Sequence, residues 1–128
     1  MKAFNEAENY NGPAIIIAYA HCIEQGLLTK TGPAHQKAAV ESVHFPLWSY
    51  NPELTAQGKN GLKVVSADKS DTVSFAKNAV SKELGENRFK QLVKKVGPEA
   101  AEATLQRAEA SFKENYKLLK ELESLGQL

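Results

Sequence analysis

The residue of this chain best suited to chemistry is its single cysteine, Cys22. It follows His21 and an unbroken apolar run over residues 14–20. A short run that is apolar at every position is typical of a strand covered on both faces, as in a parallel sheet. Ligands in such sheets bind just beyond the carboxyl ends of the strands. The sequence therefore places the thiol where an α/β protein holds its ligands.

Two kinds of thiol chemistry receive little support from the residues around the cysteine. A catalytic cysteine needs a base within reach, yet His21 is adjacent to Cys22, and adjacent residues of an extended chain point to opposite faces. A zinc site made of Cys22 with His21, His35 and His44 has no recognised ligand spacing. The remaining alternative is a buried and inert cysteine, which is the common state of a free thiol.

The elements around the predicted strand at 14–20 do not supply an evident sheet. The other strand candidates, 45–50 and 62–65, are short, and the first contains Pro46, a residue of sheet edges and strand starts. The sequence predicts helices over residues 2–10, 31–43, 83–96 and from Pro98 to about residue 125. A doubly covered strand without neighbours indicates part of a larger structure. The alternative is a small α/β domain with further, unrecognised strands.

The last of these helices carries one apolar stripe. Its residues follow steps of three and four, the spacing of one helical face: Ala101, Leu105, Ala108, Phe112, Tyr116, Leu119 and Leu122. Such a stripe usually packs against the core of its own protein, and a dimer or coiled-coil interface is the alternative. The basic residues of the preceding helix, Arg88, Lys90, Lys94 and Lys95, are interpreted as a solvated face.

Length and composition limit the function classes. The chain has 128 residues, enough for one domain, and its net charge of +1 creates no strong field to attract nucleic acid or an anionic membrane. No apolar run reaches the roughly 20 residues of a membrane span. The first residues lack the apolar core of a secretory signal, and one cysteine forms no internal disulfide. We therefore expect a cytoplasmic protein.

Several segments together resemble one protein family. Residues 12–27 (GPAIIIAYAHCIEQGL) and 44–52 (HFPLWSYNP) are similar to the region near the C-terminus of pyruvate:ferredoxin (flavodoxin) oxidoreductases. The similarity continues through Gln36, Ala39, Val40, Ser42, Leu54, residues 58–60 (GKN) and residues 87–89 (NRF). The cysteine segment and the Pro-Leu-aromatic-x-Tyr-Asn-Pro segment are specific in combination.

The resemblance implies a fold and a function. It implies that residues 1–128 are a single partial domain, the C-terminal portion of an α/β thiamine diphosphate-binding domain. This portion would have one central parallel-type strand, short edge strands and a helical tail at 83–125. The family decarboxylates pyruvate oxidatively to acetyl-CoA and passes electrons through iron–sulfur clusters to ferredoxin or flavodoxin. The cysteine that matches Cys22 is a ligand of the [4Fe–4S] cluster nearest the thiamine.

The sequence also departs from the family pattern. One cluster takes four thiolates, whereas this chain has one cysteine, and it lacks the Gly-Asp-Gly…Asn stretch that holds magnesium and the diphosphate. Phe45 stands where the family often has Trp, and Gly61 where it often has Pro. We therefore expect an isolated chain that is not catalytic, holds no cofactor and is either unstable or self-associating. Its partners would be the rest of the oxidoreductase and, through it, ferredoxin or flavodoxin. The alternative is a stand-alone, non-catalytic module that binds a partner protein.

Overall fold

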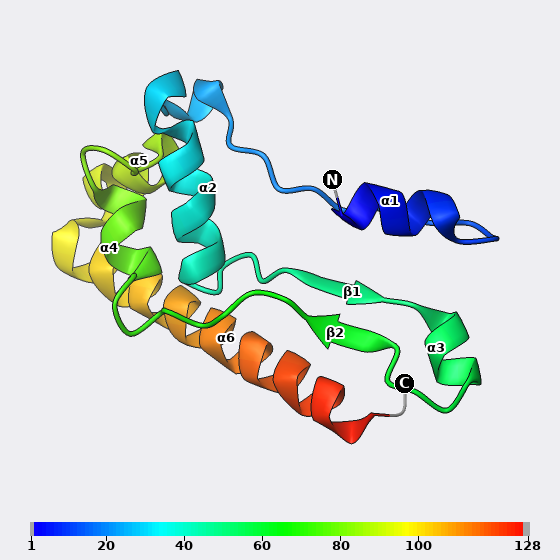
Figure 1. The fold of residues 1–128 in the computed structure, drawn as a ribbon. Coiled ribbons are helices and arrows are strands. Elements are labelled where there is room, and N and C mark those ends of the chain that lie inside the picture. The colour runs from blue at the N-terminus through cyan, green and yellow to red at the C-terminus, as the bar shows by residue number, and fades with distance from the viewer. Residues whose placement is uncertain (1, 127–128) are drawn as a thin grey trace.

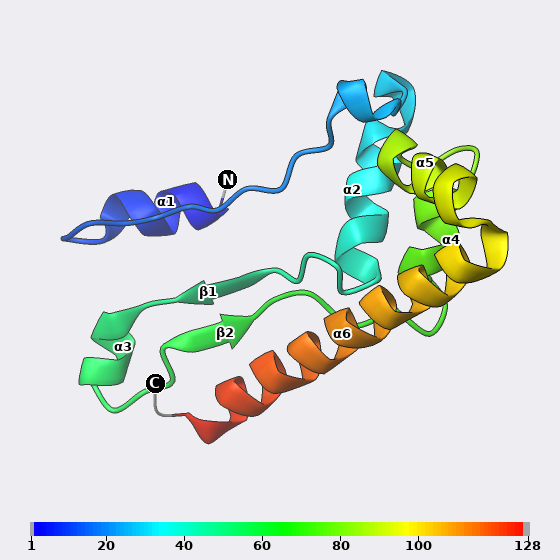
Figure 2. The same ribbon diagram turned by 180° about the vertical axis from the view of Figure 1, so that it is seen from behind.

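A computed structural model describes residues 2–126 of the chain. The helices and strands, in order, are α1 (Lys2–Asn9), the 3-10 helices η1 (Ile23–Gln25) and η2 (Thr29–Thr31), α2 (Gly32–Glu41), β1 (Trp48–Tyr50), α3 (Pro52–Ala56), β2 (Leu62–Val64), α4 (Phe75–Val80), α5 (Asn87–Val96) and α6 (Pro98–Leu125). Helices α2, α4 and α5 gather at one end of the molecule, and the strands lie at the other (Figure 1). Helix α6 runs along both ends, as the reverse view also shows (Figure 2).

The buried core lies at the helical end. Phe75, Ala76 and Ala79 of α4 form a cluster with Leu105 of α6. The Phe75 ring meets the rings of Phe89 and Phe112 edge-on, at centroid distances of 5.6 and 4.8 Å. This is the arrangement that aromatic quadrupoles favour. Helix α4 was not expected from the sequence, because six residues are too few to establish a helical period.

The two strands form an antiparallel pair, with Trp48 opposite Val64 and Tyr50 opposite Leu62. The strand candidates at 45–50 and 62–65 are therefore confirmed over three residues each. The connection between them begins with α3, where the Asn51 side chain accepts a hydrogen bond from the Glu53 N–H at 2.9 Å. This cap satisfies one of the free N–H groups at a helix start.

Helix α6 joins the two ends of the molecule through its apolar stripe. Ala101 and Leu105 are buried in the helical end, and Tyr116 is buried further along. The Tyr116 hydroxyl donates to the Ser66 carbonyl at 2.8 Å, and the Glu123 carboxylate accepts from the Val64 N–H at 2.7 Å. The stripe thus packs against elements of its own chain, as the spacing predicted, and fixes the strand pair to the helices.

Helix α2 ends in a strained turn. Val43 has φ of 53° and is only 1% exposed. The left-handed conformation costs a β-branched residue about 1–2 kcal/mol, so burial and the hydrogen bonds around the turn must hold it. The Phe45 N–H donates to the Ala39 carbonyl at 3.0 Å across this turn. The turn places the His44 ring 4.7 Å from both the Phe75 and the Phe112 rings.

The central parallel-type strand predicted at 14–20 is wrong for this structure. These residues form no strand, and Ile15 and Ile17 are 89% and 73% exposed. The physical reason is that β1 and β2 pair with each other and leave no strand beside the run. An apolar pattern indicates what a segment needs to bury but does not provide the neighbours that bury it. The fold is α/β in content, with an antiparallel rather than a parallel sheet.

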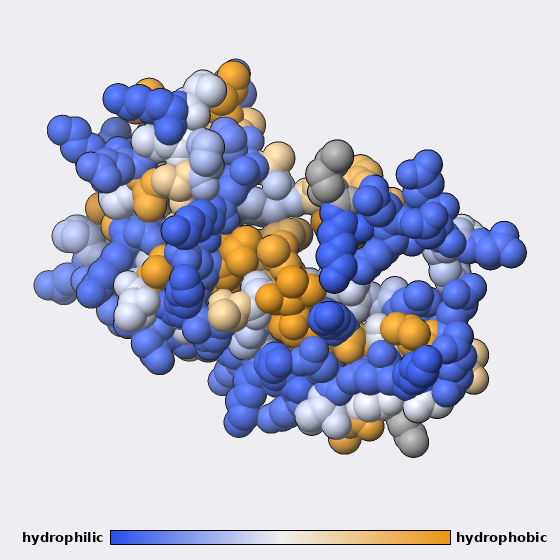
Figure 3. All heavy atoms as spheres, in the orientation of Figure 1, coloured by the Kyte–Doolittle hydropathy of each residue, from blue (hydrophilic) through white to orange (hydrophobic). Residues whose placement is uncertain are grey.

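Helix α1 stands apart from the other elements and has no buried residue (Figures 1 and 2). The space-filling view shows apolar atoms gathered in the middle of one face, between the helical end and α1 (Figure 3). Within residues 2–126, no helix combines the length and the apolar character required to cross a membrane.

Candidate functional site

The Cys22 thiol is exposed and free. Its backbone is extended, with φ of −114° and ψ of 126°, and η1 begins at the next residue. The Cys22 carbonyl accepts from the Gln25 N–H at 3.0 Å, which closes the first turn after the cysteine. The alternative of a buried cysteine is therefore wrong, and the thiol is accessible from outside.

His21 lies on the opposite side of the chain from Cys22. Tyr19 and His21 are partly buried, whereas Ala20 and Cys22 are exposed. A Cβ atom at Gly32 would come within 2.5 Å of the His21 ring, so the ring is seated closely on the start of α2. Partly buried and exposed residues thus alternate from Tyr19 to Cys22, which confirms that neighbouring side chains point to opposite faces. His21 is consequently not placed to act as a base for Cys22.

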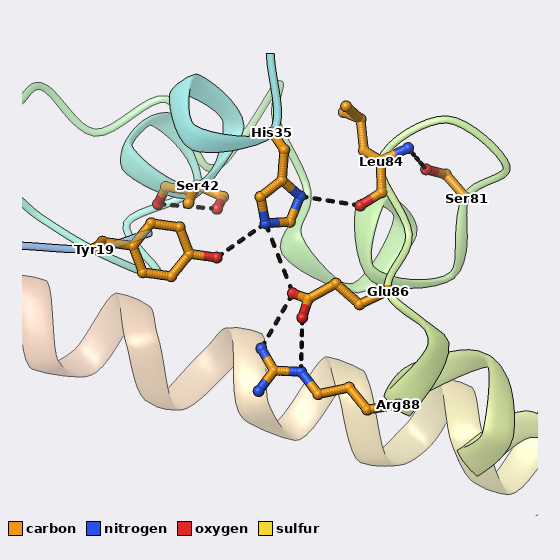
Figure 4. A network of polar contacts seen from close by, with 8 residues as sticks. Tyr19, His35, Ser42, Ser81, Leu84, Glu86 and Arg88 are labelled. Carbon is orange, nitrogen blue, oxygen red and sulfur yellow. Dashed lines mark hydrogen bonds and ion pairs between the residues drawn. The ribbon is translucent and has the colours of Figure 1, made fainter. Parts of the chain in front are cut away.

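Tyr19 connects this segment to a partly buried polar network (Figure 4). Its hydroxyl lies 2.9 Å from Nε2 of His35 on α2, and the Nδ1 atom of His35 lies 3.0 Å from the Leu84 carbonyl. A carbonyl only accepts hydrogen bonds, so Nδ1 carries the hydrogen and Nε2 of the neutral ring accepts from Tyr19. The His35 ring therefore joins segments far apart in the sequence.

A buried carboxylate lies behind the histidine and pairs with an exposed arginine. Glu86 is 5% exposed, and one of its oxygens lies 3.7 Å from His35 Nε2. Arg88 donates to both Glu86 oxygens, at 3.0 and 3.1 Å, and this pairing offsets the burial of the carboxylate. Burial and then the Glu86 charge raise the pKa of Tyr19 above its usual 10.0, against a smaller opposing effect of Arg88. The Tyr19 hydroxyl thus keeps its proton and remains a donor.

The zinc set considered from the sequence is not assembled. The structure brings no three or more His, Cys, Asp and Glu side chains into a metal-binding group within residues 2–126. His35 is engaged with Tyr19 and Leu84, and His44 is packed between aromatic rings. Burial first, and then the charge of Arg88, lower the pKa of His44 below its usual 6.5.

Other residues of the resemblance make packing contacts that sequence reasoning missed. Gly26 ends η1 in the left-handed region, with φ of 76°, and a Cβ there would lie 2.6 Å from the Asn87 amide. The Asn87 side chain thus lies directly against the turn that follows the cysteine. The buried position of Glu86 has no signal in the sequence. The polar contact of Tyr19 did have a signal in the sequence, because a tyrosine inside an apolar run carries a hydroxyl that needs a partner.

A groove of about 950 Å³ lies between α4, α5 and α6, away from the cysteine segment. Its lining includes Lys90 and Lys94, two of the four basic residues interpreted as a solvated face, together with Lys77. Acidic groups offset this charge, because Lys113 lies 3.7 Å from Glu109 and 3.8 Å from Asp71 within the same groove.

This chain can supply one of the ligands of an iron–sulfur cluster. A [4Fe–4S] cluster is bound by four thiolates, and the exposed Cys22 thiol is of the right type for one of them. No further cysteine exists in the chain. The other three ligands of any such cluster must therefore come from outside these 128 residues.

Comparison with known proteins identifies the class. The chain is 42% identical over 124 residues to a pyruvate-flavodoxin oxidoreductase of Nostoc, a match that covers 97% of this chain and 10% of the relative. It is 43% identical over 124 residues to the pyruvate:ferredoxin oxidoreductase of Moorella thermoacetica, covering 94% of this chain and 10% of the relative. A mitochondrial pyruvate dehydrogenase [NADP(+)] of Euglena gracilis is 41% identical over 70 residues, which are 52% of this chain and 4% of that protein. No family model matches the chain.

These matches define a class of pyruvate oxidoreductases, and the resemblance drawn from the sequence is confirmed. The chain belongs to the pyruvate-flavodoxin/ferredoxin oxidoreductase family as one segment of it. It spans about a tenth of the length of the curated relatives that it matches.

Proposed function

We propose that this segment is the C-terminal part of the thiamine diphosphate-binding domain of a pyruvate:ferredoxin or pyruvate:flavodoxin oxidoreductase. In that enzyme, Cys22 supplies one thiolate to the [4Fe–4S] cluster nearest the thiamine. The observation that carries the proposal is the exposed, unpaired thiol of Cys22, held on extended backbone with its neighbours turned the other way. The segment by itself is not catalytic, because it has one of the four thiolates that a cluster takes.

The unpaired run at 14–20 supports a place inside a larger protein. Ile15, Ile16 and Ile17 are 89%, 40% and 73% exposed, although each would stabilise a fold by about 1.5–3 kcal/mol if buried. Apolar residues that are exposed in one segment are expected to be covered in the whole. Strands of the remaining enzyme would provide both the hydrogen bonds and the cover.

The relatives also indicate which half of the reaction the segment serves. Their names share pyruvate but differ in the electron acceptor, which is flavodoxin, ferredoxin or NADP(+). A segment that matches the flavodoxin and the ferredoxin enzyme over nearly its whole length is expected to act where those two enzymes agree. This favours a role near the pyruvate and its first electron carrier rather than at the docking site of the acceptor.

The bound cluster would accept and pass on single electrons from the decarboxylated substrate. The residues of this chain have simpler tasks. Cys22 offers a thiolate, and Tyr19 and His21 hold the backbone so that the thiol faces outward. Arg88 neutralises the buried Glu86 beside them.

The test is the Cys22→Ser variant in the complete enzyme. Serine is nearly the same size, but its oxygen is a poorer iron ligand than a thiolate, so the fold should persist while the cluster nearest the thiamine changes its potential or occupancy. Pyruvate-dependent electron delivery should fall. The control is Lys117→Ala, which removes an exposed charge of α6 outside the cysteine segment and should leave all clusters unchanged.

Two outcomes would count against the proposal. Equal electron transfer in Cys22→Ser and the unmodified enzyme, with every cluster present by paramagnetic resonance, would exclude Cys22 as a ligand. A stoichiometric cluster reconstituted in the isolated monomer would contradict the ligand count. The non-catalytic, partner-binding module would then be the better explanation of the exposed segment.

A further inference from the structure

The segment that carries Cys22 touches the rest of the molecule at few points. Between residues 11 and 22, Tyr19 and His21 are the partly buried residues. The Tyr19 hydroxyl makes the side-chain hydrogen bond that joins this stretch to α2, at 2.9 Å from His35. The Tyr19 ring also packs against Phe45, with 5.2 Å between ring centroids. On the N-terminal side of Cys22, the side chains that can set its position are therefore those of Tyr19 and His21.

We infer that Tyr19, His35, Leu84, Glu86 and Arg88 form a latch that positions the Cys22 thiol for its cluster, with Tyr19 as the positioning residue. The inference rests on the proposed function of Cys22. It adds that a specific polar network, and not general packing of apolar residues, sets the geometry of the ligand.

The latch has the geometry that this task requires. Tyr19 is three residues before Cys22, about 10 Å along an extended chain, so a fixed tyrosine limits where the thiol can go. The His35 ring is held from its other side by the Leu84 carbonyl at 3.0 Å, and it is 9% exposed. The orientation of the acceptor nitrogen that faces the Tyr19 hydroxyl is therefore fixed.

The ion pair makes the latch rigid at its far end. Glu86 is buried next to His35 and receives two hydrogen bonds from Arg88. The Glu86 N–H also donates to the Ala79 carbonyl at 3.2 Å, which ties the network to α4 and the core. Figure 4 shows the part of this network that runs from Tyr19 through His35 and Glu86 to Arg88.

The test uses the single native cysteine of this chain as the site of a nitroxide spin label. In Tyr19→Phe the ring contacts stay and the hydroxyl is lost. One neutral hydrogen bond corresponds to about 1 kcal/mol, so the ratio of released to anchored segment should rise about fivefold. The mobile component of the label's paramagnetic resonance spectrum measures that ratio.

The matched control is Tyr10→Phe, in the same N-terminal region. The Tyr10 hydroxyl makes no hydrogen bond within residues 2–126, so its loss should leave the spectrum of the label at Cys22 unchanged. Equal spectra for Tyr19→Phe and the unmodified chain would overturn the latch. So would equal mobile components in the Tyr19→Phe and Tyr10→Phe chains.

A second measurement in the complete enzyme separates the latch from the function of Cys22. Tyr19→Phe should shift the midpoint potential of the cluster nearest the thiamine, whereas Tyr10→Phe should not. A mobile label together with an unchanged cluster would refute the positioning role. If Cys22→Ser leaves every cluster intact, the proposed function fails. The spin-label spectra then still decide whether the Tyr19 hydroxyl anchors the segment that carries Cys22.

Discussion

Replacing Ile15 and Ile17 together by lysine tests the exposed state of the cysteine segment. The two side chains are 89% and 73% exposed, so they contribute little packing in the 128-residue chain. Surface changes of this kind alter the free energy of unfolding by no more than about 0.5 kcal/mol. The matched control is Leu62→Lys, because Leu62 is 5% exposed. It should lose more than about 2 kcal/mol through lost burial and an unpaired charge.

In the complete enzyme, by contrast, the same double substitution should be strongly destabilising. If strands of the parent protein cover this run, each isoleucine contributes about 1.5–3 kcal/mol there. Losing both would remove about 3–6 kcal/mol, comparable to the total stability of many domains. We expect the double variant of the complete enzyme to lose assembly and cluster content while the isolated segment stays folded.

The assay combines urea unfolding, followed by circular dichroism, with size-exclusion chromatography and light scattering. The unmodified chain should self-associate through its unpaired apolar run, and the double lysine variant should be monomeric. At a protein concentration low enough to dissociate the unmodified chain, the two should share the same unfolding midpoint, because self-association itself adds stability. A loss of more than about 2 kcal/mol in the isolated double variant would refute the reasoning. It would mean that residues 14–20 are packed in solution and that the chain completes its own sheet.

Three further predictions concern the supports of the site. Gly26→Ala should destabilise the chain more than Gly58→Ala in chemical unfolding, because both residues have positive φ but only Gly26 lies against another side chain, that of Asn87. Burial raises the pKa of Glu109, but hydrogen bonds from the Ala76 N–H, Ser74 and Lys113 lower it on balance below 4.5. The stability from Glu109 is therefore present above pH 4.5 and lost as pH falls through the lowered pKa, and Glu109→Gln should flatten the acid limb of a stability–pH curve. His44 should titrate below 6.5 by NMR, since burial between aromatic rings disfavours its charged form; a midpoint at or above 6.5 would contradict its packing.

Much of the helical structure followed from local pattern. The steps of three and four from Ala101 to Leu122 predicted the buried stripe of α6, and Pro98 marked its start. The two short strands were also expected, over ranges longer than the three residues each that the structure forms. Cys22 stood out because it was the only thiol after an apolar run, and the resemblance named the family that the comparisons confirm.

The position of each candidate group depended on the tertiary structure. Periodicity predicted a covered strand at 14–20, but cover requires neighbouring strands, and residues 2–126 form only the pair of β1 with β2. His35 meets Tyr19 across 16 residues and Leu84 across 49, and no local rule connects such partners. Glu86 is buried because Arg88 compensates its charge in place. Residue type thus determined what Cys22 can bind, and long-range packing decided which way it faces and what holds it there.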